Sequence, residues 1–478
     1  MFDLNKKLKL KVSSIILKNL SEIDEVISAT IVGTFNNKRF SDIDTVVICK
    51  KLNRNVFFKC NKTCKNLINS VTELKKKKLK IKINNTFGPL KFDDEKNLVI
   101  HLMIYDIDSH IKHVINSPFT CLDWERSKTF KGLKLSDICS PISIQFSDFF
   151  KARRGMYDYL KDIKNNKISY RKYKWYGDKF ILEKKEKELN KRDKFEFCYH
   201  ILNNTLNNFL KFKYQKNLNS SLKSKISLLE IINKEIVKDY LLLRRCKQKK
   251  IFVTKINLID VTNKFIKSFI IFLDKYTNQA QILKFVRHEK TLLNNGSFLG
   301  VKRNPPIIKK KLKKNKEHFD VIISSPLKRT LQTSKYFNFN RIITNKKLIE
   351  INYGKMEGKK FYKNDNKMKS LFLKMSNNIN IKFPEGESYK EVLLRTKLFL
   401  NKDIKRFRES RILIITHNVV LRTIIGNYFN FHHSQWHLIQ INNMKSFIIY
   451  KIDNRHIIDI NRRFFIKKYK NDNKVNYI

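Results

Sequence analysis

The stretch Phe285-Val-Arg-His-Glu-Lys-Thr291 decides the fold of the last third of the chain. Residues 281–286 contain an apolar run rich in β-branched and aromatic side chains, and such a run predicts a buried strand. A strand that ends at Arg287 and His288 delivers a guanidinium and an imidazole to the carboxyl edge of a sheet. Open α/β sheets bind their ligands at that edge, so this pair is a candidate site.

Four further segments downstream add strand ends, turns and charged side chains. They are residues 320–333 with Arg329, residues 348–358 with Glu350 and Glu357, the turn 383–388 before Arg395, and residues 411–417 with His417. Neutral imidazole is a nucleophile near neutral pH, and guanidinium groups match phosphate oxygens with paired hydrogen bonds. A positioned carboxylic acid protonates the leaving oxygen. The set therefore indicates phosphoryl transfer through a covalent phosphohistidine.

The order and spacing of these motifs resemble the histidine phosphatase superfamily, over about residues 280–465. The resemblance implies a three-layer α/β domain of the phosphoglycerate-mutase-like fold. It also implies that His288 takes the phosphoryl group and that Glu350 protonates the leaving oxygen. The groups implied to contact the phosphoryl oxygens or the substrate are Arg287, Arg329, His417, Asn294 and Asn418.

Two positions depart from the family pattern. Glu289 and Asn418 stand where glycine is common after each histidine, and glycine lets a backbone approach a ligand closely. A degenerate family member that keeps only the fold is therefore an alternative. The run 358–384 is short compared with the capping insertion of mutases, so we expect water to reach the phosphohistidine and hydrolyse it.

A second motif lies near the N-terminus. Two apolar runs flank a turn; the first ends at Gly33-Thr34 and the second opens with Asp42 and Asp44. Alternation along a strand puts the two carboxylates on one face, about 7 Å apart, where they can share a divalent cation. The backbone N–H groups of Gly33 and Thr34 are suited to a triphosphate.

This motif resembles the DNA polymerase β-like nucleotidyltransferase superfamily, which has a mixed-sheet α/β fold. The resemblance implies that Asp42 and Asp44 bind Mg²⁺, which aligns a nucleoside triphosphate with an acceptor hydroxyl. A third carboxylate is usual on a later strand, but residues 97–106 carry Val99 at the aligned position, with His101 nearby. The alternative is that the two aspartates only cap the start of a strand.

The length of 478 residues predicts about three domains. We expect a nucleotidyltransferase-like domain at 1–145, a helical bundle at 146–278, where amphipathic periodicity dominates, and a histidine phosphatase domain at 279–478. The chain would then be a bifunctional enzyme. Its partners would be a phosphorylated small molecule and a nucleoside triphosphate.

The composition bears on partners and location. Lys and Arg total 101 against 43 Asp and Glu, a net charge of +58, but the excess is spread through every region. A charge of this size keeps open the alternative of a nucleic-acid-binding or end-modifying protein with an inactive phosphatase-like half. The even spread of the excess, which forms no separate patch, does not favour it. Seven scattered cysteines argue against a disulfide framework and predict the cytoplasm. No apolar run reaches the ~18 residues that span a bilayer, so we expect no membrane partner.

Overall fold

A computed structural model of the chain describes residues 6–33, 42–67, 71, 80–88, 97–124, 127, 129–139, 143–151, 155–214, 221–249, 251, 252, 255–308, 315–360, 366, 370, 374, 375, 378–452 and 455–465. The chain divides into two compact units. The first comprises Met1–Leu273 with Asp472–Ile478, and the second comprises Asp274–Asn471. The three-domain division stays a prediction.

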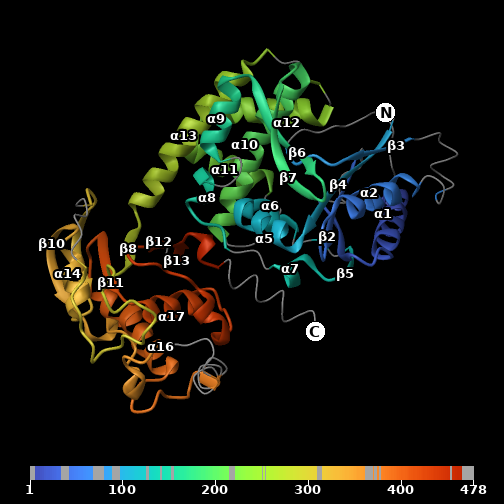
Figure 1. Cartoon of the computed structure of the whole chain (residues 1–478). Helices are drawn as coiled ribbons and strands as arrows, with labels where there is room; N and C mark the ends of the chain where they lie inside the picture. The colour runs from blue at the N-terminus through green and yellow to red at the C-terminus, as the bar shows by residue number, and fades with distance from the viewer. Residues whose placement is uncertain are drawn as a thin grey trace. The chain divides into compact units, whose positions relative to one another are not determined.

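A mixed sheet of five strands, in the order β3-β4-β2-β1-β5, forms the centre of the first unit. Strands β2, β3 and β4 run parallel, while β1 is antiparallel to both β2 and β5. Helices α1 and α2 contact each other and pack on this sheet (Figure 1). The elements are α1 (Lys6–Ser21), β1 (Val26–Val32), β2 (Asp42–Cys49), α2 (Arg54–Lys65), β3 (Lys80–Asn84), β4 (Asn97–Asp106), α5 (Ile107–Asn116), α6 (Pro118–Trp124), β5 (Phe130–Gly132) and α7 (Leu135–Ile138).

The region predicted to be a helical bundle also contains a β-hairpin that the prediction missed. Its strands pair around a two-residue turn at Gly177-Asp178, where Gly177 has a φ of +57°. Two residues of β6, Ile168 and Tyr173, are buried. The elements are α8 (Asp148–Lys151), α9 (Met156–Lys164), β6 (Lys167–Tyr176), β7 (Lys179–Glu188), α10 (Lys191–Tyr214), α11 (Leu222–Asn233), α12 (Ile236–Lys249) and α13 (Leu258–Asn278).

The second unit is built on a six-stranded sheet of order β10-β9-β11-β8-β12-β13. The first four strands of that order are parallel, and β12 and β13 are antiparallel additions. Helix α14 contacts β9 and β11, α17 contacts β8, and α16 packs on α17 (Figure 1). The elements are β8 (Gln281–Arg287), β9 (His318–Ser324), α14 (Lys328–Ser334), β10 (Asn338–Thr344), η1 (Lys346–Leu348), η2 (Gly354–Met356), α16 (Tyr389–Leu398), η3 (Phe399–Asp403), η4 (Ile404–Arg406), β11 (Arg411–Thr416), α17 (Asn418–Tyr428), η5 (His433–Leu438), β12 (Ser446–Ile452), β13 (Arg455–Asp459) and η6 (Arg462–Phe465).

Apolar strand residues form the core of the second unit. One buried cluster joins Val286 of β8, Phe319 and Ile322 of β9, and Leu413 and Ile415 of β11. The central parallel strands β9 and β11 are buried on both faces, which explains why their sequences are nearly continuous apolar runs, whereas the edge strand β10 is largely exposed. The predicted strands that end in histidine therefore form adjacent members of one sheet.

Two further observations concern the cysteines and the helices. All seven cysteines are free thiols and all are buried. Within the described parts of the chain, no helix has the length and apolar character needed to cross a bilayer. Location in the cytoplasm stays a prediction.

Candidate active site

The two strand-end histidines meet at one edge of the sheet. Strands β8 and β11 are parallel neighbours in which Arg287 pairs with Thr416, so the residues that follow both strands emerge together. The His288 backbone N–H donates to the Thr416 carbonyl at 3.0 Å. The ring centroids of His288 and His417 lie 5.1 Å apart, and both side chains are buried.

Hydrogen-bond partners define the tautomer of each imidazole. His288 Nδ1 lies 2.6 Å from the Glu289 carbonyl, which only accepts, so Nδ1 carries the proton and Nε2 keeps its lone pair. His417 Nδ1 accepts from Arg329 Nε at 3.2 Å, so its proton lies on Nε2, 2.8 Å from Ser325 Oγ. Burial, together with the charges of Arg329 and Arg287, lowers the pKa of His288 to about 3. Burial and Arg329 also hold the pKa of His417 well below its usual range.

Two arginines border the histidines. Arg329 lies on the first turn of α14 and is 0% exposed. Besides its bond to His417, its NH2 donates to the Gly300 carbonyl at 2.9 Å and its NH1 to the Arg303 carbonyl at 3.2 Å. Among the described residues, three of its five N–H groups have acceptors, and the other two can bind a ligand.

Among the described residues, Arg287 has fewer hydrogen-bond acceptors for its N–H groups than Arg329 has. Its NH1 donates to the Ile441 carbonyl at 2.6 Å. Its Nε is buried without a hydrogen-bond partner among the described residues. A buried donor without an acceptor is costly, so this N–H is suited to an incoming anion. Burial lowers the pKa of the guanidinium to about 10, which leaves it charged at neutral pH.

Glu350 provides a carboxyl group at the same edge. The side chain is 7% exposed, and its Oε1 accepts from the N–H groups of Ile351 at 3.1 Å and Val419 at 3.3 Å. Burial raises the pKa of Glu350, although the nearby Arg329 opposes the shift. Burial therefore makes this carboxyl group easier to protonate than an ordinary glutamate, and the protonated acid is the form that donates a proton.

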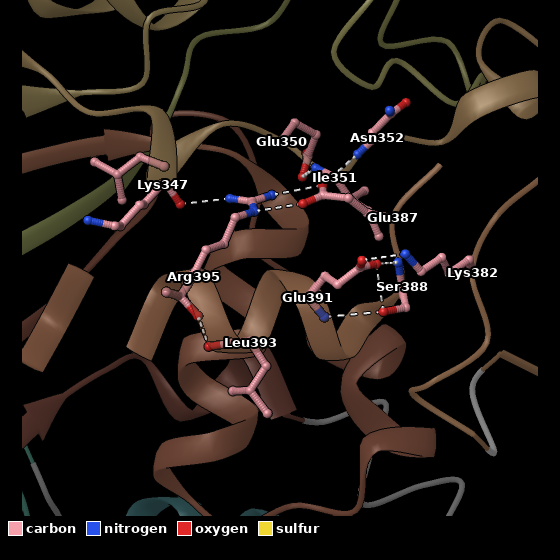
Figure 2. A network of polar contacts seen from close by, with 12 residues as sticks. Lys347, Glu350, Ile351, Asn352, Lys382, Glu387, Ser388, Glu391, Leu393 and Arg395 are labelled. Atoms are coloured by element: carbon pink, nitrogen blue, oxygen red, sulfur yellow. Dashed lines mark hydrogen bonds and ion pairs between the residues drawn. The ribbon is translucent and has the colours of Figure 1, made fainter. Parts of the chain in front are cut away.

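A salt-bridged network holds the segment that carries Glu350 (Figure 2). Arg395 on α16 binds both carboxylate oxygens of Glu387 at 3.0 and 3.2 Å and donates to the Lys347 carbonyl at 2.7 Å. Glu387 in turn accepts from the Asn352 backbone N–H at 2.9 Å. Lys347 and Asn352 flank Glu350 on either side in sequence, so the network restrains its loop.

Glu289 and Asn418 occupy the two positions where the family commonly has glycine. Glu289 carries the carbonyl that orients His288, and its own N–H donates to Thr333 Oγ1 at 2.9 Å. Its carboxylate turns back to the Lys290 N–H at 2.7 Å. Asn418 begins α17, and its Oδ1 is buried without a hydrogen-bond partner among the described residues.

Asn294 has its carbonyl oxygen engaged locally. Its Oδ1 accepts from Thr291 N at 2.8 Å and Thr291 Oγ1 at 3.1 Å, which closes the turn after His288. The side-chain Nδ2 is then the donor through which Asn294 would contact a substrate.

Two residues near the histidines were missed by the sequence reasoning. Ser325 bonds His417, and Asn443 Nδ2 donates to the His288 carbonyl at 2.7 Å. Ser325 directly follows β9, whose carboxyl end lies at the same edge as the histidines, so the strand pattern contained a signal for it. Asn443 lies 155 residues from His288, and nothing local to its position in the sequence marks it.

The predicted nucleotide site of the first unit is only partly described. Thr34 lies outside the described residues, while Gly33 has a φ of +91° and lies beside Asp44, since a Cβ there would be 3.3 Å from Oδ2. Asp42 and Asp44 occur two residues apart on β2, as predicted. In the register with β4, Asp42 faces Val99 and Asp44 faces His101.

Asp44 has a histidine as its neighbour on the next strand. His101 Nδ1 lies 2.9 Å from Asp44 Oδ1, and a backbone carbonyl, that of Thr86, faces the other ring nitrogen. Burial disfavours the charged imidazole, but the hydrogen bond and charge of Asp44 outweigh it and raise the pKa of His101. Across the described segments, no three acidic, histidine or cysteine side chains converge on a metal position. Magnesium binding stays a prediction.

Comparison with known proteins bears on the second unit. Residues 308–459 match the family model of the histidine phosphatase superfamily (branch 1). The resemblance inferred from the motifs is confirmed over that range, and a phosphoglycerate-mutase-like α/β domain is supported. The match begins after His288, so the role of that histidine depends on its geometry.

Two curated relatives come from Hydrogenobacter thermophilus. "Putative phosphoserine phosphatase 2" is 30% identical over 114 residues, which cover 23% of this chain and 56% of that protein. Phosphoserine phosphatase 1 is 28% identical over 149 residues, 30% of this chain and 70% of that protein. The matched region thus spans just over half the length of the first relative.

Two solved structures each align with more than a third of the chain. YhfR of Bacillus stearothermophilus is 19% identical, covers 37% of this chain and 95% of its own, and has a TM-score of 0.33. The phosphoserine phosphatase of Entamoeba histolytica in complex with 3-phosphoglyceric acid is 20% identical, covers 37% and 95%, and has a TM-score of 0.32.

Proposed function

We propose that the second unit hydrolyses phosphomonoesters through a phosphohistidine formed on His288. The observation that carries the proposal is the orientation of His288 by the Glu289 carbonyl, which leaves a neutral imidazole with its lone pair on Nε2. The family match over residues 308–459 supports the same class of reaction.

In the first step, His288 Nε2 attacks phosphorus and the ester P–O bond breaks. The leaving oxygen takes the proton of the Glu350 carboxyl group, whose pKa is raised by burial. The free N–H groups of Arg287 and Arg329 bind the phosphoryl oxygens and offset their charge in a buried site.

In the second step, the Glu350 carboxylate accepts a proton from water while the water oxygen attacks phosphorus. The P–N bond breaks, inorganic phosphate forms, and His288 returns to its neutral state. His417 stays neutral throughout. Its Nδ1 accepts from Arg329, so its proton lies on Nε2, which donates to Ser325 Oγ in this structure. We infer that Asn418 Oδ1, a buried acceptor, receives a donor of the substrate.

The substrate class that we propose is a phosphorylated small molecule. One relative is named a phosphoserine phosphatase and another was solved with 3-phosphoglyceric acid, and both names are consistent with this class. Hydrolysis is expected to exceed isomerisation, although much of the run 358–384 lies outside the described residues. Isomerisation of a phosphorylated metabolite faster than release of inorganic phosphate would contradict this part of the proposal.

The test of the mechanism is chemical labelling. A ³²P-labelled phosphomonoester is expected to leave an acid-labile, base-stable phosphoryl group on the wild-type protein, and His288→Ala is expected to abolish it. Labelling that survives in His288→Ala would overturn the assignment of the nucleophile. An unlabelled wild-type protein would favour the degenerate family member.

The nucleotidyl transfer of the first unit stays a prediction. Asp42 and Asp44 support it, while Val99, at the position aligned with the usual third carboxylate, does not. Asp42→Ala is expected to remove any Mg²⁺-dependent transfer from a nucleoside triphosphate and to leave phosphatase turnover unchanged. A transfer activity that persists in Asp42→Ala would exclude Asp42 as a ligand.

A further inference from the structure

The carboxylate of Glu357 binds three successive backbone N–H groups of one loop. Its Oε1 accepts from Val301 at 2.8 Å, and its Oε2 accepts from Lys302 at 2.8 Å and from Arg303 at 3.2 Å. Three charge-assisted hydrogen bonds to one carboxylate restrain a loop that has no regular secondary structure.

The loop fits closely against this carboxylate. Gly300, with a φ of +56°, precedes the three donors, and a Cβ at this position would lie 2.2 Å from Glu357 Cδ. Only glycine accommodates both the positive φ and this close approach.

Backbone carbonyl groups of the same loop bind Arg329. The carbonyls of Gly300 and Arg303 accept from Arg329 NH2 and NH1, at 2.9 and 3.2 Å. Nε of the same guanidinium donates to His417. The loop therefore connects Glu357 to the arginine that borders the two histidines. Burial lowers the pKa of Arg329, and the charges of Glu350 and Glu357 oppose this shift.

We propose that Glu357 is a positioning residue for phosphoryl binding. Its carboxylate fixes the backbone of residues 300–303, whose carbonyls direct the two free N–H groups of Arg329 toward an anion at His288. The inference rests on the proposed phosphatase function and deepens it, because it extends the phosphate site to a residue that does not touch the substrate. A misplacement of Arg329 by about 1 Å is sufficient to lower turnover by about 10²-fold.

The test is a double-mutant cycle on Glu357 and Arg329. Glu357→Gln keeps the shape of the side chain but replaces one acceptor oxygen with a donor that faces the loop N–H groups. We expect kcat/KM to fall about 10- to 10²-fold, and calorimetric binding of orthovanadate to weaken by a similar factor. In the Arg329→Ala background, Glu357→Gln is expected to change both quantities less than about twofold.

Glu385→Gln is the matched control. Its carboxylate has 60% side-chain exposure and pairs with Lys355 at 2.5 Å, so both readouts are expected to stay at the wild-type level. Should Glu357→Gln not fold, Glu357→Asp keeps both oxygens on a shorter side chain and is expected to give a smaller loss of the same kind.

Three outcomes separate the proposals. An equal loss from Glu357→Gln in both backgrounds, or no loss in either, would overturn the role of Glu357. Vanadate binding that follows the expected cycle in a protein without turnover or labelling would overturn only the phosphatase function. If turnover and vanadate binding both follow the expected double-mutant cycle, the role of Glu357 and the phosphatase function are both supported.

Discussion

The burial of His288 in its neutral form makes the second unit sensitive to acid. Its pKa is lowered from 6.5 to about 3 in the folded chain, so between these values the unfolded chain binds the proton and the folded chain does not. The sign of the linkage then makes stability fall as pH falls through this window. From one group with these two pKa values, the loss between pH 7 and pH 5 is about 2 kcal/mol.

His288→Gln removes this titration and is expected to remove about 2 kcal/mol of the acid-induced loss over the same interval. The free energy of opening can be measured by hydrogen exchange of peptides that cover β8 and β11, at pH 7 and pH 5. Comparison of the change with pH, rather than the absolute value, cancels the cost of placing glutamine in the buried site.

His417→Gln provides a parallel variant. Burial also lowers the pKa of His417, so its removal is expected to reduce the acid sensitivity in the same direction. A His288→Gln protein that loses as much stability as wild type between pH 7 and pH 5 would refute the buried neutral imidazole. The argument for His288 as a nucleophile would then lose its physical basis.

Three further predictions concern single side chains. Glu350→Gln is expected to lower turnover of an alkyl phosphate by roughly 10² to 10⁴ and that of a nitrophenyl phosphate far less. With the alkyl phosphate, kcat/KM of the wild-type protein is expected to decline as pH rises through the raised pKa of Glu350, and this decline is expected to disappear in Glu350→Gln. Glu387→Gln leaves Arg395 without its full partner and is expected to cost about 1 to 3 kcal/mol, measured by hydrogen exchange of α16, and to reduce kcat through the Glu350 loop. Tyr173→Phe removes a buried hydroxyl that bonds the Ile104 N–H at 3.0 Å and is expected to cost about 1 kcal/mol, seen as faster exchange in β4, with unchanged phosphatase rates.

The sequence alone determined the elements whose signal is local. The apolar run of residues 281–286 and the one before His417 predicted strands that both end in histidine, and β8 and β11 have this arrangement. Two parallel strands in one sheet place their ends at one edge, so the proximity of His288 and His417 followed from the pattern. The hairpin was missed because residues 167–176 lack a strict alternation of apolar and polar side chains, and the two buried residues of β6, Ile168 and Tyr173, lie five positions apart.

Only the tertiary structure decided the partners of these groups. His417 meets Arg329 across 88 residues and Ser325 across 92, and these bonds assign its proton to Nε2. Glu357 was marked in the sequence only as a carboxylate between glycines, and its three amide partners lie more than 50 residues away. Local periodicity reports which face of an element is apolar, whereas hydrogen bonds between distant segments depend on how the elements pack. The protonation states of the histidines and the orientation of Arg329 therefore could be read only from the folded structure.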